Sequence, residues 1–353
     1  MTLLEGRQIF LTGAGGFIGS RLAATLVRRG AKLTAFVRYN SRADIGLLSN
    51  LPADILNKIE IIFGDIRDAD AIEQAMGIRQ TAHNANGSEN TSSPSELVFH
   101  LGALISIPYS YLHPVETVET NILGTLNILQ ACRKSGARVV HTSTSEVYGT
   151  ALRVPIDESH PLQGQSPYSA SKIGADKLVE SYHRSYGLDT VTVRPFNTYG
   201  PGQSARAVIP TIITQALTRE QLYLGSLETR RDFTFVDDTV AGFICAAEVL
   251  LDPLRSASIS GEEINLGTGK EITIAEIAHL ILQLIGKPDL PIHVDSKRLR
   301  PEKSEVIRLL SDNRKALHLL GWSPRVDIDS GLKQTINWTK ENLEMYRPDI
   351  YER

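Results

Sequence analysis

The sequence predicts a doubly wound α/β fold with a smaller C-terminal α/β lobe. Over residues 1–205, short β-branched runs alternate with longer helical patterns, which is typical of parallel strands joined by helical crossovers. The first strand leads through a glycine-rich turn into a helix. From residue 206 onward, the strands and helices are shorter and are interrupted by Pro and Gly. We therefore divide the chain into residues 1–205 and residues 206–353, two lobes that can be interleaved.

The individual elements follow from the same patterns. Strands are predicted at Gln8–Leu11, Lys32–Val37, Ile59–Phe63, Leu97–Leu101, Ala137–His141 and Thr190–Arg194. Helices are predicted at Phe17–Arg29, Ala69–Met76, Pro114–Ser135 and Tyr168–Tyr186. Residues 77–96 break the alternation because they are polar and rich in Asn, Ser and Gly, so we expect a flexible surface excursion there. Sheets of this type bind ligands at the carboxyl ends of their strands.

The composition excludes several classes of function. Basic and acidic side chains number 37 and 40, which leaves a formal net charge of −3 and no footprint for nucleic acid. Only Cys132 and Cys245 are present, so no disulfide framework and no cysteine metal site are expected. The chain has no leader-like start and no apolar stretch near the ~18 residues of a membrane span. We expect a cytoplasmic protein without a metal ion and without a membrane partner.

The glycine-rich turn predicts a dinucleotide site. In GAGGFIGS, Gly13, Gly16 and Gly19 recur every third residue where a strand turns into a helix, with Phe17 and Ile18 opening that helix. Glycines let the backbone approach a pyrophosphate, and the helix N-terminus offers free N–H groups and the positive end of its dipole. The strand, turn and helix context supports a Rossmann-type cofactor site at these residues.

The next two strands bear on which dinucleotide binds. The second strand ends in Arg38, where an enzyme that prefers NAD usually has an acidic residue for the adenosine ribose. An arginine favours the additional phosphate of NADP, although Arg38 and Arg42 are equally compatible with solvated loop charges. Asp65 and Ile66 follow the third strand at the same edge and are expected to border the adenine. The cofactor is therefore NADP or NAD, with Arg38 in favour of NADP.

A Y-x-x-x-K pair is the first candidate for catalysis. Tyr168 and Lys172 lie one turn apart on a predicted helix, and Thr144 follows the preceding strand. A tyrosine next to a lysine and a nicotinamide charge would have a lowered pKa and could accept the proton of a sugar hydroxyl. Thr144 would hold that hydroxyl. The alternative is a packed aromatic residue beside a solvated lysine.

The chain resembles an extended short-chain dehydrogenase/reductase of the NAD-dependent epimerase/dehydratase family over almost its whole length. The matching stretches are GAGGFIG, GDIRD, HLGA, NILGTLNIL, STSEVYG, YSASK, RPFNTYGP and RRDFTFVDD. This resemblance implies a nucleotide-sugar substrate, a tightly bound and recycled cofactor, and catalysis by Thr144, Tyr168 and Lys172. Within the family, the chain is most similar to enzymes that dehydrate nucleotide-linked N-acetylglucosamine on the way to legionaminic-type sugars, and next to GDP-mannose 4,6-dehydratases.

Glu146, two residues after Thr144, fits a dehydration. Oxidation at carbon 4 acidifies the hydrogen on carbon 5, and Glu146 is expected to remove it before water leaves from carbon 6. The dTDP-glucose dehydratases resembled here carry Asp-Glu after the threonine, whereas this chain has Ser145 and Glu146. Serine is a poor acid, so Glu146 would protonate the leaving group directly or through Ser145. A capping role for Glu146 without chemistry is the plain alternative.

Three other functions remain open. The Ser-Glu pair also occurs in UDP-glucuronate decarboxylases, in which carbon dioxide leaves unaided after oxidation, and a 4-epimerase shares the same triad. A substrate carboxylate would be repelled by Glu146 unless an arginine offset it, which favours a neutral hexose. A non-catalytic dinucleotide-binding regulator is the remote alternative, because Thr144, Tyr168 and Lys172 are all present.

The resemblance also implies where the substrate is held. Arg231 and Arg300 match the phosphate-binding arginines of the family, and guanidinium groups suit a pyrophosphate well. Further expected contacts to the substrate are Asn197, Arg206, Ser106 and Tyr109, although each arginine is also compatible with a surface salt bridge. Relatives pair the helices predicted at Pro114–Ser135 and Tyr168–Tyr186 with those of a second copy, so a homodimer is expected.

Overall fold

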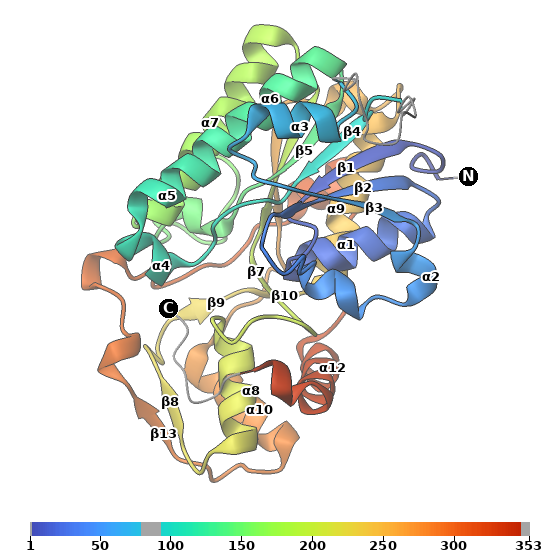
Figure 1. The fold of residues 1–353 in the computed structure, drawn as a ribbon. Coiled ribbons are helices and arrows are strands. Elements are labelled where there is room, and N and C mark those ends of the chain that lie inside the picture. Colours follow the sequence, from blue (N-terminus) through green and yellow to red (C-terminus); the bar gives the residue numbers. More distant parts are fainter. Residues whose placement is uncertain (1, 79–92, 347–353) are drawn as a thin grey trace.

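The computed structural model describes residues 2–78 and 93–346, which form two lobes (Figure 1). In the larger lobe, a seven-stranded sheet has the order β11-β6-β5-β4-β1-β2-β3, and every neighbouring pair is parallel. Its strands are β1 (Gln8–Thr12), β2 (Lys32–Arg38), β3 (Ile59–Gly64), β4 (Leu97–His100), β5 (Arg138–Thr142), β6 (Thr190–Pro195) and β11 (Glu262–Leu266). The predicted doubly wound fold is confirmed.

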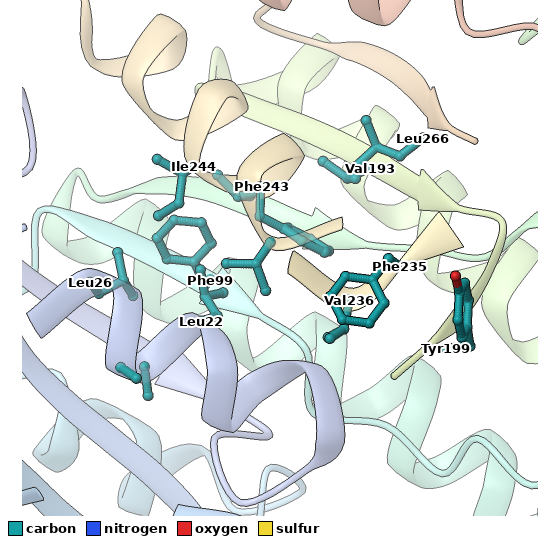
Figure 2. Close-up of a cluster of buried hydrophobic side chains, with 14 of the residues drawn as sticks. Leu22, Leu26, Phe99, Val193, Tyr199, Phe235, Val236, Phe243, Ile244 and Leu266 are labelled. Atoms are coloured by element: carbon teal, nitrogen blue, oxygen red, sulfur yellow. The ribbon is translucent and has the colours of Figure 1, made fainter. Parts of the chain in front are cut away.

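Helices cover both faces of this sheet because side chains alternate between its faces along each strand. On β4, Phe99 belongs to the apolar cluster beneath α1 (Phe17–Arg28) and α9 (Val236–Leu251). Val98 belongs instead to the cluster beneath α3 (Ala69–Ala75), α6 (Gly124–Ser135) and α7 (Pro167–Tyr186). Figure 2 shows Phe99 among Leu22 and Leu26 of α1 and Phe243 and Ile244 of α9. Strands buried on both faces explain the continuous apolar runs in the sequence.

The last strand of the large sheet comes from the C-terminal part of the chain. β11 pairs with β6, from Glu262 opposite Val191 to Leu266 opposite Pro195. The helices α9 and α11 (Arg314–Leu320) pack on this side of the same lobe. Segments after residue 206 therefore return to the large sheet, which is the interleaving that the sequence left open. The sequence analysis did not place β11 there, because its pairing depends on a contact distant along the chain.

The smaller lobe lies below the carboxyl ends of the strands in Figure 1. Its helices are α8 (Val208–Thr218), α10 (Ile274–Ile285) and α12 (Ile328–Glu341), with β8 (Leu222–Leu224) parallel to β13 (Ile292–Val294). Two short pairs connect the lobes: β7 (Asn197–Tyr199) with β10 (Phe233–Phe235), and β9 (Arg230–Arg231) with β12 (Ile272–Thr273). Shorter helices are α2 (Ala53–Leu56), α4 (Ile107–Leu112) and α5 (Pro114–Val118), and the 3₁₀ turns are Gly46–Asn50, Ser145–Tyr148, Ser256–Ser258, Ser296–Arg298, Glu302–Ser304 and Leu343–Met345.

The helix predicted at Pro114–Ser135 has the expected ends but is not uniform. A π turn at Glu119–Leu123 separates α5 from α6, a feature that is frequent near functional sites. Within this turn, Asn121 is buried; its amide donates to Leu104 O and to Ser171 Oγ, and its Oδ1 accepts from Leu104 N. The turn thereby holds α7 against the segment that follows β4.

Two observations concern predictions outside the fold itself. Most of the excursion predicted at residues 77–96 lies outside the described residues, which end at 78 and resume at 93. Across the described part of the chain, no helix combines the length and the apolar character needed to span a membrane.

Candidate active site

The glycine-rich turn lies between β1 and α1, next to the end of β4. Gly13 has a φ of +71°, and a Cβ there would lie 2.8 Å from Gly102 N. A Cβ on Gly19 would lie 2.1 Å from Gly13 O. Gly16 begins the helix, and no side chain caps that end. Only glycine fits at these positions, and the uncapped helix N-terminus lies where the strand order reverses between β1 and β4, so the turn fits a dinucleotide pyrophosphate.

Arg38, at the end of β2, is directed toward α5. Its Nη2 lies 3.3 Å from Glu116 Oε1, and its side chain is 64% exposed. Glu116 also accepts a hydrogen bond of 2.6 Å from the hydroxyl of Tyr109. Arg38 is thus at the predicted strand end and accessible, with one acidic neighbour that a phosphate group would have to outcompete.

The residues predicted to border the adenine lie directly after β3. The carboxylate of Asp65 accepts hydrogen bonds from the guanidinium of Arg67, with 2.6 Å between Oδ2 and Nη2, and this interaction holds the pKa of Asp65 below its ordinary value. Ile66 packs on Gly124, where a Cβ would lie 2.7 Å from its Cδ1. The structure therefore adds Arg67 as a neighbour that the sequence analysis did not name.

Tyr168, Lys172 and Thr144 meet at the carboxyl end of β5. Tyr168 is in the first turn of α7, which a reciprocal cap between Ser166 and Ser169 begins. Its phenol interacts with the hydroxyl of Thr144, the residue that begins the 3₁₀ turn at Ser145–Tyr148. Lys172 Nζ donates a hydrogen bond of 2.6 Å to Thr142 O, at the last residue of the strand. Tyr168 and Lys172 are both buried.

Burial shifts the titration of this pair. It raises the pKa of Tyr168 above its ordinary value, and the charges of Glu146 and Asp176 raise it further, whereas the hydrogen bond with Thr144 lowers it. Burial lowers the pKa of Lys172 to about 8, a shift that the charge of Asp176 opposes. The sequence analysis expected a lowered pKa for Tyr168 beside a nicotinamide charge. In the protein alone, desolvation of the phenolate has the larger effect, so the lowering would require the cofactor's charge.

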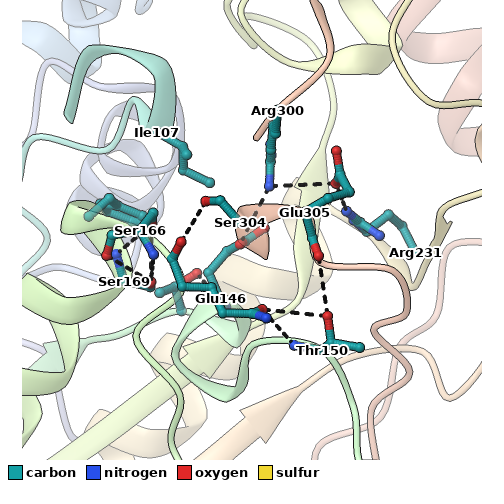
Figure 3. A network of polar contacts seen from close by, with 12 residues as sticks. Ile107, Glu146, Thr150, Ser166, Ser169, Arg231, Arg300, Ser304 and Glu305 are labelled. Carbon is teal, nitrogen blue, oxygen red and sulfur yellow. Dashed lines mark hydrogen bonds and ion pairs between the residues drawn. The ribbon is translucent and has the colours of Figure 1, made fainter. Parts of the chain in front are cut away.

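Glu146 lies in a network of two arginines and a second carboxylate (Figure 3). Glu146 Oε2 lies 3.7 Å from Arg300 Nη1, and only 12% of the Glu146 side chain is exposed. Arg300 Nη1 also lies 4.0 Å from Glu305 Oε1, and Arg231 Nη2 lies 3.4 Å from the same Glu305 oxygen. The sequence analysis named Glu146, Arg231 and Arg300 but missed Glu305. A signal was present, because Glu305 belongs to the same stretch, LRPEKSE, as Arg300.

The electrostatics of this network bear on what it can bind. Arg231 is buried, and burial lowers its pKa, while Glu146 and Glu305 oppose the shift. Arg300 Nη1 is buried and, within the described residues, has no hydrogen-bond partner at bonding distance. The ion pairs of Arg300 are long, so its guanidinium can still form shorter contacts with a stronger acceptor. A substrate pyrophosphate is such an acceptor.

The other predicted contacts lie on separate segments. Asn197 begins β7, and its buried Oδ1 has no hydrogen-bond partner in the described part of the chain. Ser106 caps α4 by accepting from Tyr109 N at 3.3 Å. Arg206 is exposed before α8 and lies close enough to Tyr109 to lower its pKa against the dominant effect of Glu116. Ser145 is buried directly after Thr144, in the turn that positions Glu146.

Comparison with known proteins identifies the family of this chain. The family model of GDP-mannose 4,6 dehydratase matches residues 10–335. The chain belongs to this family. A dTDP-glucose 4,6-dehydratase of Streptomyces antibioticus is 32% identical over 348 residues, which cover 97% of this chain and 95% of that protein. This result confirms the predicted membership of the wider NAD-dependent epimerase/dehydratase group.

Other relatives of the GDP-mannose 4,6 dehydratase family have different activities. A UDP-glucose 4-epimerase of Mycolicibacterium smegmatis is 32% identical over 96% of this chain and 100% of that protein. UDP-glucuronic acid decarboxylase 1 of Xenopus tropicalis is 30% identical over 96% of this chain and 74% of that protein. The structure of a dTDP-glucose 4,6-dehydratase from Streptomyces venezuelae with NAD bound has a TM-score of 0.77 and 29% identity, covering 96% of this chain and 99% of that one. Membership of the family therefore leaves the reaction to be argued from the site.

Proposed function

We propose that the protein is a nucleotide-sugar 4,6-dehydratase that converts a nucleotide-linked hexose into its 4-keto-6-deoxy form. One observation carries this proposal. The carboxylate of Glu146 is largely buried, two residues after Thr144, at the same strand end as Tyr168 and Lys172. A group that acts as a base on carbon 5 has to lie on the ring that Tyr168 and Thr144 hold by its 4-hydroxyl. Lyase activity follows from that arrangement.

The chain's own residues account for each proton. Tyr168 removes the proton from the 4-hydroxyl, which Thr144 orients, and Lys172 stabilises the phenolate. A bound NAD(P) supplies a hydride acceptor at carbon 4 and returns the hydride at carbon 6. Glu146 removes the proton on carbon 5, made acidic by the neighbouring ketone, and gives it to the departing hydroxyl directly or through Ser145. Because the hydride returns in every cycle, the cofactor need not be exchanged.

The binding residues divide between the two lobes. The turn at Gly13, Gly16 and Gly19 would hold the cofactor pyrophosphate, since a Cβ at Gly13 or Gly19 would occupy the backbone's place. Arg231 and Arg300 would hold the substrate diphosphate at the boundary with the smaller lobe, with Asn197, Ser106 and Arg206 as further contacts. The resemblance of PFNTYGPGQSARAVIPTII to legionaminic-type dehydratases supports N-acetylglucosamine as the sugar.

UDP-glucuronate decarboxylation is the second candidate, and one observation favours it. Arg300 Nη1 lies 3.7 Å from Glu146, so a cation is available that could offset a substrate carboxylate beside Glu146. This candidate and a 4-epimerase share the oxidation at carbon 4 with the dehydratase. The reactions differ only in what leaves the sugar.

The mass of the product distinguishes these reactions. The purified protein is incubated separately with UDP- and GDP-linked N-acetylhexosamines and hexoses and with UDP-glucuronate, and the products are weighed. We expect an N-acetylglucosamine nucleotide to lose the mass of one water. Loss of carbon dioxide from UDP-glucuronate would establish the second candidate, and an unchanged mass with altered stereochemistry would establish the epimerase. Either result would contradict the dehydratase.

The cofactor preference is a separate prediction. Because Arg38 is exposed at the end of β2, we propose that it binds the additional phosphate of NADP. Calorimetry on the protein freed of nucleotide should show tighter binding of NADP than of NAD. Arg38→Ala should weaken NADP binding by about 10- to 100-fold, the loss of one charge-assisted contact, and leave NAD binding nearly unchanged. Equal wild-type affinities would contradict the assignment, as would a preference for NAD.

A homodimer is proposed from the surface of α5 and α7, which pack side by side. The apolar side chains of Val115, Val118 and Leu123 are 68%, 43% and 41% exposed, and Tyr186 at the end of α7 is 50% exposed. Covering such a surface with the same helices of a second copy would remove it from water. Sedimentation equilibrium should therefore give twice the mass of the chain, and a monomer at micromolar concentration would contradict the proposal.

A further inference from the structure

A buried polar cluster lies behind the proposed catalytic pair, and its centre is Asp176. The Asp176 side chain is 1% exposed. Its Oδ2 accepts hydrogen bonds from Ser143 Oγ at 2.7 Å, from Arg194 Nη2 at 3.0 Å and from Arg194 Nε at 3.2 Å. Its Oδ1 lies 3.3 Å from His141 Nε2. One carboxylate on α7 thus contacts both β5 and β6 where they reach the candidate site.

The spacing connects this cluster to catalysis. Asp176 follows Lys172 by one helical turn, so both side chains are on the face of α7 that is turned toward the sheet. Lys172 Nζ donates to Thr142 O, the neighbour of Ser143, and Thr144 follows Ser143. The three consecutive residues 142–144 are therefore bound, in order, by Lys172, by Asp176 and, through its phenol, by Tyr168.

We propose that Asp176 is a positioning residue for the lysine of the reaction. Its carboxylate fastens α7 to the ends of β5 and β6, and its negative charge keeps the buried Lys172 protonated. A charge on this face is otherwise unfavourable, since burying an ammonium group without an opposite charge favours its neutral form. This inference rests on the proposed function, because the protonated Lys172 matters only where Tyr168 must lose its proton.

The surrounding groups leave Asp176 as the source of the negative charge. From β5 and β4, His141 and His100 face the cluster; burial lowers the pKa of His141 to about 4 and that of His100 well below its ordinary value, so both are neutral near pH 7. Other facing groups are Arg194 on β6, Tyr148 and Glu146 on the 3₁₀ turn, Tyr168 on α7, and Glu263 on β11, which lies 3.5 Å from Arg194. The pKa of Asp176 itself is about 2, because contacts with His141 and Arg194 outweigh its burial, so its carboxylate is charged throughout the working range.

The sign of the expected change follows from the charge that is lost. Asp176 raises the pKa of both Lys172 and Tyr168. In Asp176→Asn, the amide keeps the size of the side chain and an oxygen acceptor for Ser143, but the negative charge is gone. Lys172 should then lose its proton below pH 8, lower by about one unit or more. The alkaline and acidic limbs of the rate profile should both move to lower pH, which a loss of packing alone would not cause.

The test combines two measurements on the full-length protein. Titration of lysine labelled with ¹³C at Cε and observed by NMR, with Lys172→Arg to assign the signal, gives the pKa of Lys172 without any substrate. The pH dependence of turnover is measured in parallel. In Asp176→Asn, kcat at pH 8 should fall by about tenfold for each unit of the Lys172 shift. Ser143→Ala, which removes a hydrogen bond to the same carboxylate but no charge, should leave the pKa of Lys172 at its wild-type value.

An unchanged pKa of Lys172 in Asp176→Asn would overturn the proposal. If that variant does not fold because Arg194 loses its main partner, Asp176→Asn combined with Arg194→Gln removes both charges, and the same downward shift is expected. A wild-type Lys172 pKa in the double variant would be equally decisive against the proposal. Should the protein convert no nucleotide sugar, the proposed function fails on its own, and the NMR titration still decides what Asp176 does to Lys172.

Discussion

Tyr168→Phe is expected to abolish turnover while leaving dinucleotide binding intact. Tyr168 is buried in contact with Thr144, and its phenol is the group proposed to take the proton of the 4-hydroxyl. Removing a positioned base costs about 10²- to 10⁴-fold in rate. The glycine-rich turn that would bind the cofactor pyrophosphate lies on another element, between β1 and α1, so affinity for NAD(P) should change little. The fold should survive, because phenylalanine fills the same space and only one hydroxyl is lost, at about 1 kcal/mol.

Turnover of Tyr168→Phe is measured on the nucleotide sugar that the product-mass experiment identifies, alongside cofactor calorimetry and thermal unfolding. Tyr182→Phe is the matched control, since it removes a phenol from a second buried tyrosine of α7, well along the helix from the strand end. The control should keep wild-type activity. Turnover of Tyr168→Phe within about tenfold of wild type would remove this residue from its role as the base.

Glu146→Gln is expected to separate oxidation from elimination. The amide keeps the size of the side chain but cannot accept the proton of carbon 5, so formation of the 4-keto-6-deoxy product should fall by about 10²- to 10⁴-fold. Oxidation at carbon 4 depends on Tyr168, Lys172 and Thr144 and should persist in part. Two signals report on this: reduced cofactor appearing in the absorbance spectrum, and loss of deuterium incorporation at carbon 5 in heavy water.

Glu305→Gln is the matched control for this experiment, because Glu305 is the other carboxylate near Arg300. Glu305 also pairs with Arg231, so its replacement should change the KM for a diphosphate-linked sugar through both arginines. Exchange at carbon 5 should continue in Glu305→Gln and stop in Glu146→Gln. Wild-type product yield from Glu146→Gln would show that Glu146 takes no part in elimination, and a plain capping role would then describe it better.

The order of strands and helices was predictable because it depends on short-range patterns. Apolar runs such as Ala137–His141 and the glycine spacing in GAGGFIGS act over a few residues, and the observed ends differ from the predicted ones by one residue or so, as for β1 and β5. The π turn at Glu119–Leu123 was not predictable in this way, because the extra residue per turn leaves the apolar pattern of the helix nearly unchanged.

Strand β11 shows a different limit. Glu262–Leu266 looked like any short strand of the C-terminal lobe, and its place beside β6 depends on a pairing with residues more than sixty positions earlier. Glu305 and Asp176 were missed for the same kind of reason. Each is an ordinary acidic residue in its own segment, and its importance appears only when Arg231 and Arg300, or Ser143 and Arg194, are brought to it.

The sequence by itself determined the doubly wound fold, the glycine turn for a dinucleotide, and the placement of Thr144, Tyr168 and Lys172 at one strand end, because each rests on spacing within a single segment or on strand ends that a parallel sheet must bring to one edge. Only the tertiary structure decided which charges face one another. Glu146 lies beside an arginine that is distant in the chain, and Lys172 has Asp176 and two neutral histidines behind it. Such pairings depend on how helices and lobes pack, and burial then determines how strongly the paired charges act on each other.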